Sequence, residues 1–451
     1  MERVKRIAAA VALFLAAAMM LSGCSFVGLD AQTLMHAPKP TGENEADIQH
    51  LLDETAGGQM TLKYPVSGEY RSAILKHDLS GDKADEAIAF YQKSDDADGT
   101  NIVFMQREGT WKIVGTFSNQ ATQVDRICYG DLYGDGKDEA VVGWGNSLNN
   151  NGAICVYSYK NGKVTEQRLK QTYTEMEVED FDGDGRSEIF TANITQGDQP
   201  AEACLIRVDS DHAEVMGSAP LDSGVTHYAS VQTGLIDKKQ KGVVLDGVKS
   251  SNTMVTELLY WDAKKKALVA PFYDAASKMV KSTARATAVV ATDINSDKII
   301  EVPIVSLMPG YSDSTADEAD CLTTWERYDT QNNTFSRVRS MVINFADGYM
   351  FSIPSAWRGK ITTKMDPSTR SFSFYQWMQS PKNATGVLGP QLLRIEVFTK
   401  KEWDAGTGTK DYFELYNKDN LVFAAVRPSP DNSLSLTEVE IKEAFQLINK
   451  E

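Results

Sequence analysis

The nine residues DFDGDGRSE, from Asp180 to Glu188, place four carboxylates in one short loop. Side chains at positions 1, 3, 5 and 9 of such a loop converge on one point, and a glycine at position 6 permits the sharp bend. Calcium prefers about six to eight hard oxygen ligands, and a backbone carbonyl at position 7 adds to the set. We therefore expect a calcium site whose side-chain ligands are Asp180, Asp182, Asp184 and Glu188.

Three related loops carry an incomplete set of calcium ligands. The loop that begins at Asp131 keeps Asp135 and Glu139, but a tyrosine stands at position 3. In two further loops, which begin at Asp78 and Asp293, a lysine replaces the glycine at the bend. These three loops are candidate calcium sites that match the ligand pattern less well than the Asp180 loop.

A metal-free turn is the alternative for every acidic loop, because aspartates at positions 1 and 3 can accept backbone N–H groups without an ion. An EF-hand does not fit, since position 12 is never acidic in the loops and is followed by a strand-like run. If an ion is bound in any of these loops, we expect it to be structural. It would stiffen the loop and would leave no open coordination position for chemistry.

Sequence motifs of catalysis are missing from the chain. There is no Gly-x-Ser-x-Gly elbow, no His-Glu-x-x-His and no phosphate-binding glycine loop, and the five histidines are scattered. We therefore expect a binding protein rather than an enzyme. A carbohydrate-active enzyme with two carboxylates in a central pocket is the alternative, because such sets need no sequence signature.

The acidic loops belong to an internal repeat of about 50 to 57 residues. The repeats begin at Asp78, Asp131, Asp180, a degenerate copy at Asp237, and Asp293. Each repeat also has a turn sequence about 30 residues after its loop, of which Asn161-Gly162 is the strongest hairpin signal. In the second repeat the expected strands are residues 125–129, 139–144, 153–159 and 163–169. The pattern predicts a mainly β protein with about five blades of four antiparallel strands, a β-propeller.

These loops resemble the FG-GAP and VCBS repeats of integrin-α-type propellers, whose pattern is Asp-x-Asp/Asn-x-Asp-Gly-x-x-Asp/Glu before a small apolar strand. The resemblance covers about Ser72 to Phe345, although the Phe-Gly and Gly-Ala-Pro signatures are mostly missing. It implies a β-propeller over residues 58–345 in which calcium supports the blades.

The N-terminus is typical of a secretory signal, with basic residues, an apolar run from Ile7 to Leu21, and LSGC ending at Cys24. LSGC resembles the lipobox of bacterial lipoproteins, which implies a signal peptide over residues 1–23 and an acylated Cys24. We expect residues 24–57 to form a tether with one short helix. The resemblance places the protein on the extracytoplasmic face of the cell membrane, held in the lipid bilayer by Cys24.

The last part of the chain, residues 346–451, lacks the repeat and predicts a small α+β domain. Ser435 and Glu438 fit a capping box before a terminal helix. The formal net charge of −16 argues against a nucleic-acid partner. Together these features predict a membrane-anchored lipoprotein that acts as a binding or scaffold module for an envelope protein or glycan.

Overall fold

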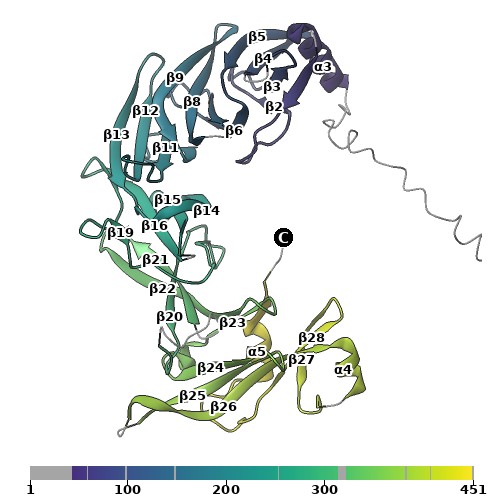
Figure 1. The fold of residues 1–451 in the computed structure, drawn as a ribbon, viewed down its shortest axis with the longest axis vertical. Helices are drawn as coiled ribbons and strands as arrows, with labels where there is room; N and C mark the ends of the chain where they lie inside the picture. The colour runs from purple at the N-terminus through teal and green to yellow at the C-terminus, as the bar shows by residue number, and fades with distance from the viewer. Residues whose placement is uncertain are drawn as a thin grey trace, which may run out of the picture. The chain divides into compact units, whose positions relative to one another are not determined.

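The computed structural model describes most of the chain (Figure 1), namely residues 43–57, 59–96, 99–146, 149–251, 253–312, 321–380, 383–406 and 408–448. The predicted signal peptide and Cys24 lie outside these residues. The described part is mainly β, as expected. Two compact units divide the chain, one of residues 1–126 with 160–165 and one of residues 127–159 with 166–451. No described helix has the length and apolar character needed to span a membrane.

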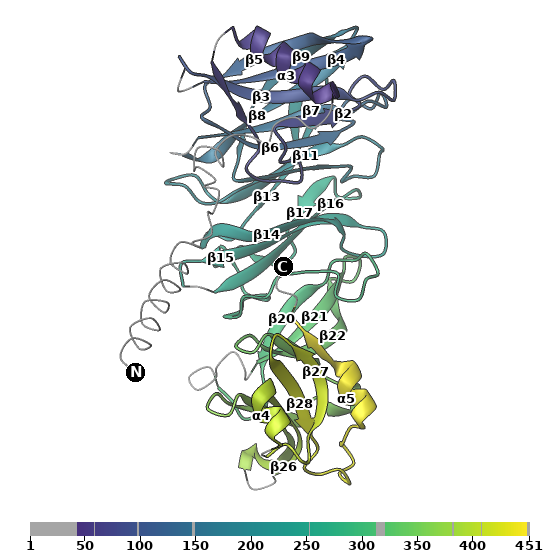
Figure 2. The same ribbon diagram turned by 90° about the vertical axis from the view of Figure 1, so that its right-hand side faces the viewer.

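The first unit contains one helix and a five-stranded sheet. The sheet has the order β1-β3-β4-β5, and β2 also pairs with β3. Its strands are β1 (Met60–Lys63), β2 (Ile74–His77), β3 (Glu86–Lys93), β4 (Thr100–Glu108) and β5 (Thr110–Asn119). Helix α3 (Glu43–Ala56) confirms the expected helix, and Figure 2 shows it against this sheet. Ile48, Leu52 and Ala56 recur every four residues on one face of α3 and pack with Ala87 and Met105 of the sheet.

Three antiparallel sheets of four strands follow, each ordered as in the sequence. The strands predicted for the second repeat are confirmed as β6 (Gln123–Gly130), β7 (Glu139–Asn146), β8 (Asn149–Lys160) and β9 (Lys163–Tyr173). The next sheet contains β10 (Glu175–Glu179), β11 (Glu188–Asn193), β12 (Glu202–Val208) and β13 (Ala213–Pro220). The third contains β14 (Val225–Leu235), β15 (Lys241–Lys249), β16 (Met254–Asp262) and β17 (Ala267–Val269). A short hairpin of β18 (Tyr273–Asp274) and β19 (Met279–Val280) comes after them.

Tight turns join the third and fourth strands of the repeats. Between β8 and β9, Asn161 and Gly162 both have positive φ, 53° and 77°. This is the two-residue hairpin that Asn-Gly predicts, because its backbone twist matches that of the flanking strands.

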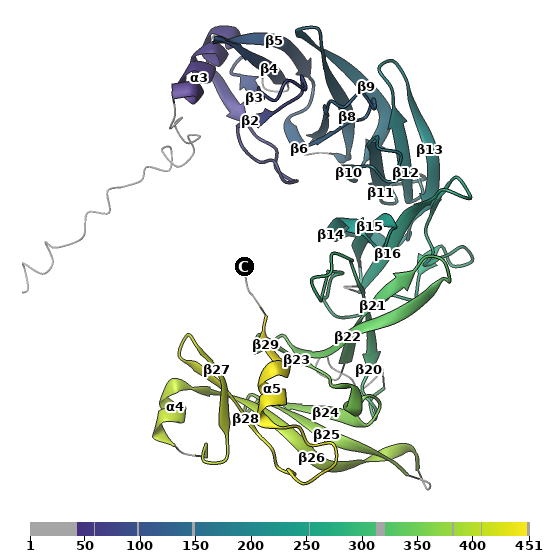
Figure 3. The same ribbon diagram turned by 180° about the vertical axis from the view of Figure 1, so that it is seen from behind.

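The fifth repeat forms a sheet with the order β20-β21-β22-β23-β29 (Figure 3). Its strands are β20 (Val302–Leu307), β21 (Cys321–Asp329), β22 (Thr334–Asn344), β23 (Tyr349–Ser352) and β29 (Phe445–Leu447). The strand expected before its acidic loop is reduced to one bridge, between Thr292 and Glu301. Strand β29 pairs with β23 through Tyr349↔Leu447 and Phe351↔Phe445. The sheet thus takes strands from both sides of the boundary expected at residues 345 and 346.

The remaining C-terminal strands form a second sheet, β24-β25-β26-β28-β27. Its strands are β24 (Ile361–Asp366), β25 (Ser371–Ser380), β26 (Asn383–Thr399), β27 (Phe413–Lys418) and β28 (Leu421–Val426), accompanied by the 3-10 turn η2 (Ser355–Trp357) and helix α4 (Lys400–Ala405). One hydrophobic core joins this sheet to the fifth-repeat sheet, with Trp357 fully buried at its centre.

The terminal helix begins and ends elsewhere than we expected. Helix α5 spans Glu438–Ala444, and its capping box consists of Thr437 and Glu440 instead of Ser435 and Glu438. Both pairs satisfy the Ser/Thr-x-x-Glu pattern, so the pattern alone does not select between them. The chain turns extended at Phe445, because that residue and the next two pair with β23.

Candidate functional site

The four acidic loops share one backbone conformation. Position 4 has a φ between 63° and 80° in all of them, and position 6 has a φ between 70° and 92°. Position 4 is Gly81, Gly134, Gly183 or Ser296, and position 6 is Lys83, Gly136, Gly185 or Lys298. The repeat seen in the sequence is therefore also a repeat in structure at these loops.

The aspartate at position 1 holds each loop closed. Asp180 accepts hydrogen bonds from the N–H groups of Gly183 at 2.7 Å and Gly185 at 3.1 Å. Asp78 and Asp131, the first aspartates of two other loops, accept the same two hydrogen bonds. In both loops the N–H of position 4 lies at 2.7 Å and the N–H of position 6 at 2.8 Å. This is the Asx-type turn of the metal-free alternative, and it uses both oxygens of the aspartate.

The glutamate at position 9 is buried under every loop. The exposed fractions are 1% for Glu86, 2% for Glu139, and 0% for Glu188 and Glu301. In each case one carboxylate oxygen accepts the N–H of position 2 at 2.8 to 3.1 Å. Burial raises the pKa of all four, to about 8 for Glu139 and about 7 for Glu188. A cation beside such a carboxylate favours its ionised form and offsets part of the effect of burial.

An arginine supplies this cation in the Asp180 loop. The register of β11 and β12 pairs Ile189 with Ile206, so Glu188 and Arg207 lie opposite each other. Arg207 Nη2 lies 2.5 Å from Glu188 Oε1 and 2.8 Å from an oxygen of both Asp182 and Asp184. One guanidinium therefore contacts three of the four predicted calcium ligands.

The fifth repeat contains the same arrangement. Arg327 Nη2 lies 2.5 Å from Asp297 and 2.8 Å from Glu301. Sequence reasoning missed both arginines. A weak signal exists, because Arg207 and Arg327 each stand two residues before an aspartate that opens the next turn.

The other two loops have neutral residues at the place of the arginine. The β7–β8 register sets Ser158 opposite Glu139, and the β3–β4 register sets Gln106 opposite Glu86. In the Asp131 loop the ring of Tyr133 replaces the carboxylate of position 3, and its hydroxyl donates to Gln167 at 3.4 Å. The four loops thus share a backbone but differ in how the buried glutamate is compensated.

Among the described residues, Asp180, Asp182 and Glu188 form one cluster whose carboxylate oxygens lie within 4.8 Å of one another, close enough to share a metal ion. Arg207 contacts two of these three residues, so an ion that enters the cluster has to replace the guanidinium. The predicted ligands Asp131, Asp135 and Glu139 share one loop of the same shape, but they are not a cluster of this kind among the residues that the structure describes.

Lysine at the bend of a loop carries a backbone cost that glycine avoids. Lys298 has a φ of 70°, and a left-handed backbone costs about 1–2 kcal/mol for a residue with a Cβ. Because glycine is more flexible in the unfolded chain, replacing Lys298 by glycine is expected to raise the free energy of unfolding by a net ~0.5–1 kcal/mol. Urea unfolding measures this change. Gly185→Lys in the Asp180 loop is the matched control and should have the opposite sign; equal signs would contradict the argument.

The fourth repeat buries charge in another way. Arg285 and Asp246 are both fully buried and lie 2.8 Å apart. Arg285 also donates to Val289 O at 2.7 Å and to Thr256 Oγ1 at 2.9 Å, and Asp246 accepts the N–H of Ala291 at 2.8 Å. This network links β15 and β16 to the segment after β19.

A second buried group in the same sheet contains two carboxylates. Asp222 and Glu257 are 0% and 3% exposed. Lys249 Nζ lies 2.7 Å from Asp222, and Glu257 accepts the Asp222 N–H at 2.7 Å and the Tyr228 hydroxyl at 3.1 Å. Burial, together with the negative charge of Asp222, raises the pKa of Glu257 to about 7.

This raised pKa predicts a pH-dependent stability. Between the usual value of 4.5 and about 7, folded Glu257 binds more protons than unfolded Glu257, so its contribution is present at low pH and is lost as the pH rises through 7. Thermal unfolding between pH 5 and 8.5 should therefore show falling stability. Glu257→Gln should flatten that part of the profile, and an unchanged slope would be the contrary result.

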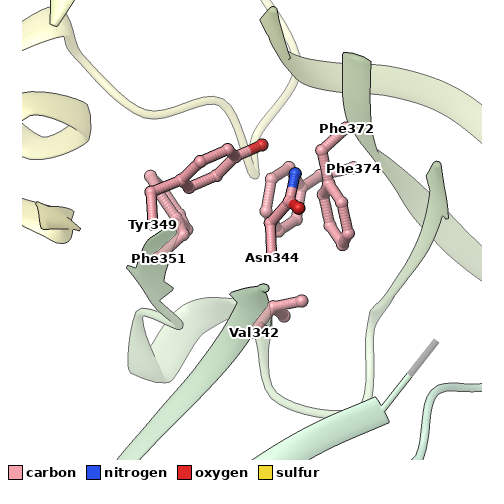
Figure 4. A pocket seen from close by; sticks show the side chains of 6 residues that line it. All are labelled: Val342, Asn344, Tyr349, Phe351, Phe372 and Phe374. Atoms are coloured by element: carbon pink, nitrogen blue, oxygen red, sulfur yellow. The ribbon is translucent and has the colours of Figure 1, made fainter. Parts of the chain in front are cut away.

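A small hollow with no room for a water molecule lies between the two C-terminal sheets (Figure 4). Its lining is apolar or aromatic except for Asn344, and consists of Val342, Asn344, Tyr349, Phe351, Phe372 and Phe374. Asn344 is held by Asp347 through two hydrogen bonds of 3.1 and 3.0 Å. Apart from Asn344, these residues belong to the hydrophobic core that joins the sheets, so the hollow is a feature of packing.

Comparison with known proteins finds no matching family model and no matching curated protein. Among solved structures, the chain is similar to the C-terminal domain of Pseudomonas aeruginosa PilY1, with a TM-score of 0.32, 13% identity, and coverage of 79% of this chain and 78% of that one. It is also similar to the exotype rhamnogalacturonan lyase YesX, with a TM-score of 0.28, 13% identity, and coverage of 75% and 65%. A Lactobacillus plantarum protein gives a TM-score of 0.28, 8% identity, and coverage of 68% and 81%. Likenesses this distant assign no family and no activity.

Proposed function

We propose that the protein is a membrane-anchored, extracytoplasmic lipoprotein that acts as a binding or scaffold module. The observation that carries this proposal is the state of the loop carboxylates. They accept hydrogen bonds from backbone N–H groups of their own loops, and in two loops they also pair with Arg207 or Arg327. Carboxylates held in this way stabilise a strand connection and are not free for catalysis.

The proposal includes a β-propeller of about five blades over residues 58–345. Its support is the series of antiparallel sheets in sequence order, with an acidic loop at the same place in four repeats. A four-stranded sheet has two faces to bury, and radial stacking lets each sheet cover its neighbours. The FG-GAP and VCBS resemblance of the loops agrees with this arrangement.

Calcium has a place in this proposal as an alternative to arginine at the Asp180 loop. Asp180, Asp182, Asp184 and Glu188 would hold the ion and supply the hard oxygen ligands that calcium prefers. The guanidinium of Arg207 neutralises the same carboxylates without an ion. We therefore propose that either cation supports the loop, and that the two exclude each other.

The carbohydrate-active alternative gains no support from the buried carboxylates. Asp222 and Glu257 are neighbouring carboxylates, but both side chains are buried at the fourth sheet. A glycan needs to reach both carboxylates at once. This pair therefore serves the fold.

The membrane anchor is tested by replacing Cys24 with serine. The thiol accepts the acyl chain in the lipobox resemblance, so C24S is expected to lose labelled palmitate and to leave the membrane fraction. The control C128S, in strand β6, should keep both. A C24S protein that stays labelled and membrane-bound would refute the anchor, and crosslinking of the anchored protein in its native cell would identify what it contacts.

A further inference from the structure

Six lysines gather at one end of the fourth sheet. Two belong to the connection between β14 and β15, one is the first residue of β15, and three belong to the turn between β16 and β17. Antiparallel strands place both connections at the same end, and Gln240 Nε2 donates to the carbonyl of Trp261 at 3.2 Å across them. We call these six residues the lysine cluster: Lys238, Lys239, Lys241, Lys264, Lys265 and Lys266.

The two aspartates of these connections are engaged by local hydrogen bonds. Asp237 accepts from the N–H and the hydroxyl of Thr330 at 3.2 and 3.1 Å. Asp262 accepts the N–H groups of Lys264 and Lys265 at 3.0 and 3.1 Å. Six lysines against these two aspartates, Glu179 and Asp329 leave a local net charge of about +2 in a chain whose net charge is −16.

Two members of the cluster have ion-pair partners. Lys241 Nζ lies 2.6 Å from Glu179, and Lys265 Nζ lies 3.1 Å from Asp262. The other four, which are Lys238, Lys239, Lys264 and Lys266, are exposed and pair with no acidic side chain in the described part of the chain. Lys238 is close enough to Asp329 to help lower the pKa of that carboxyl. Neighbouring ammonium groups that outnumber their counter-charges repel one another, and a bound anion relieves this repulsion.

The fold does not require these lysines. The first connection is closed by backbone bonding of Ile236 N–H to Gln240 O at 2.9 Å. In the second, Lys266 has a φ of 50°, and the matching residue of the fifth repeat is Asn333 with a φ of 54°. Asparagine tolerates this left-handed backbone better than lysine, because its short polar side chain can form a local hydrogen bond. Lys266 thus stands at a turn position whose backbone conformation favours asparagine.

We infer that the lysine cluster is a docking surface for a linear polyanion that carries phosphate groups at intervals. This inference rests on the proposed binding function and gives the chemistry of the partner. Lysine binds phosphate as a point charge without the planar fork of arginine, so repeated charge is recognised in preference to a shaped group. The aromatic side chains that precede the second turn, Tyr260 and Trp261, are 5% and 8% exposed, so neither offers a base or a sugar ring a stacking platform.

Binding of the full chain to long-chain inorganic polyphosphate tests the inference. The quadruple variant of Lys238, Lys239, Lys264 and Lys266 to glutamine is expected to lose about tenfold or more in affinity at low salt. Its affinity should also fall less steeply with salt concentration, because fewer counterions are released. The control replaces four exposed lysines elsewhere by glutamine, namely Lys360, Lys401, Lys410 and Lys418, and should keep its affinity.

Both quadruple variants change the net charge equally, so equal losses would overturn the docking surface in favour of overall charge. Unchanged binding of the cluster variant would also overturn it. So would binding of the full chain to polygalacturonate, or to phosphatidylglycerol vesicles, without binding to polyphosphate. A double variant, K238E with K264E, repeats the test if the quadruple variant unfolds. Membrane fractionation of the same protein is measured in parallel. Loss of membrane attachment would contradict the proposed Cys24 anchor, whereas loss of polyphosphate binding would contradict only the docking surface.

Discussion

Replacing Arg285 by methionine is expected to lower the free energy of unfolding of the second unit by about 3–5 kcal/mol. Arg285 and Asp246 are both fully buried, so removal of the guanidinium leaves a carboxylate without a counter-charge in the core. The N–H of Ala291 and the hydroxyl of Thr256 still donate to Asp246, but two hydrogen bonds from neutral groups do not replace the lost charge. Urea unfolding, followed by circular dichroism, measures the change.

Two further variants make this prediction specific. R285M combined with Asp246→Leu removes both charges and should recover much of the loss, because a buried pair costs desolvation that apolar residues avoid. Arg168→Met is the surface control, since the Arg168 side chain is 55% exposed in its pair with Glu166. Its expected effect is below about 1 kcal/mol. A loss below about 1 kcal/mol in R285M as well would show that the buried ion pair contributes little to the free energy of unfolding.

Replacing Arg207 by methionine is expected to destabilise the third repeat by about 3 kcal/mol in the presence of a chelator. Glu188 is fully buried, and the variant deprives it and two aspartates of their shared cation. The same change should create calcium dependence, since four carboxylates then surround an unfilled position. At a calcium concentration 100 times the dissociation constant, binding would return about 2.7 kcal/mol.

Thermal unfolding with calcium and with chelator separates the outcomes. The natural chain should show a small shift between the two conditions and R207M a large one. Adding Asp184→Ala to R207M should reduce the calcium response, because one ligand is lost. A natural chain that responds to calcium as strongly as R207M would refute the exclusion between ion and guanidinium.

Local sequence patterns predicted the repeated elements well. Asn161-Gly162 marks the turn between β8 and β9, and the strands predicted around it were confirmed. The acidic loops were located because their conformation depends on a few residues close in sequence, as with Asp180 and its two glycine N–H donors. Information of this kind lies within about ten residues of chain.

The contacts that could not be predicted from the sequence depend on the register between paired strands. Glu188 and Arg207 lie 19 residues apart and meet only because Ile189 pairs with Ile206. A shift of one residue would turn Arg207 to the other face of the sheet. The same limit hid the pairing of β29 with β23, since no pattern near Phe445 distinguishes one more helical turn from a strand that joins a distant sheet.

The pairing of β29 with β23 also orders the events of folding. Strand β23 leaves the ribosome or a translocation channel about 90 residues before its partner, which at about 5–20 residues per second is a delay of several seconds. Until Phe445 to Leu447 arrive, the outer edge of β23 is an open template for another chain. Phe445 to Leu447 therefore act as a late clasp, and a chain cut short before Phe445 should aggregate through the edge that this clasp normally covers.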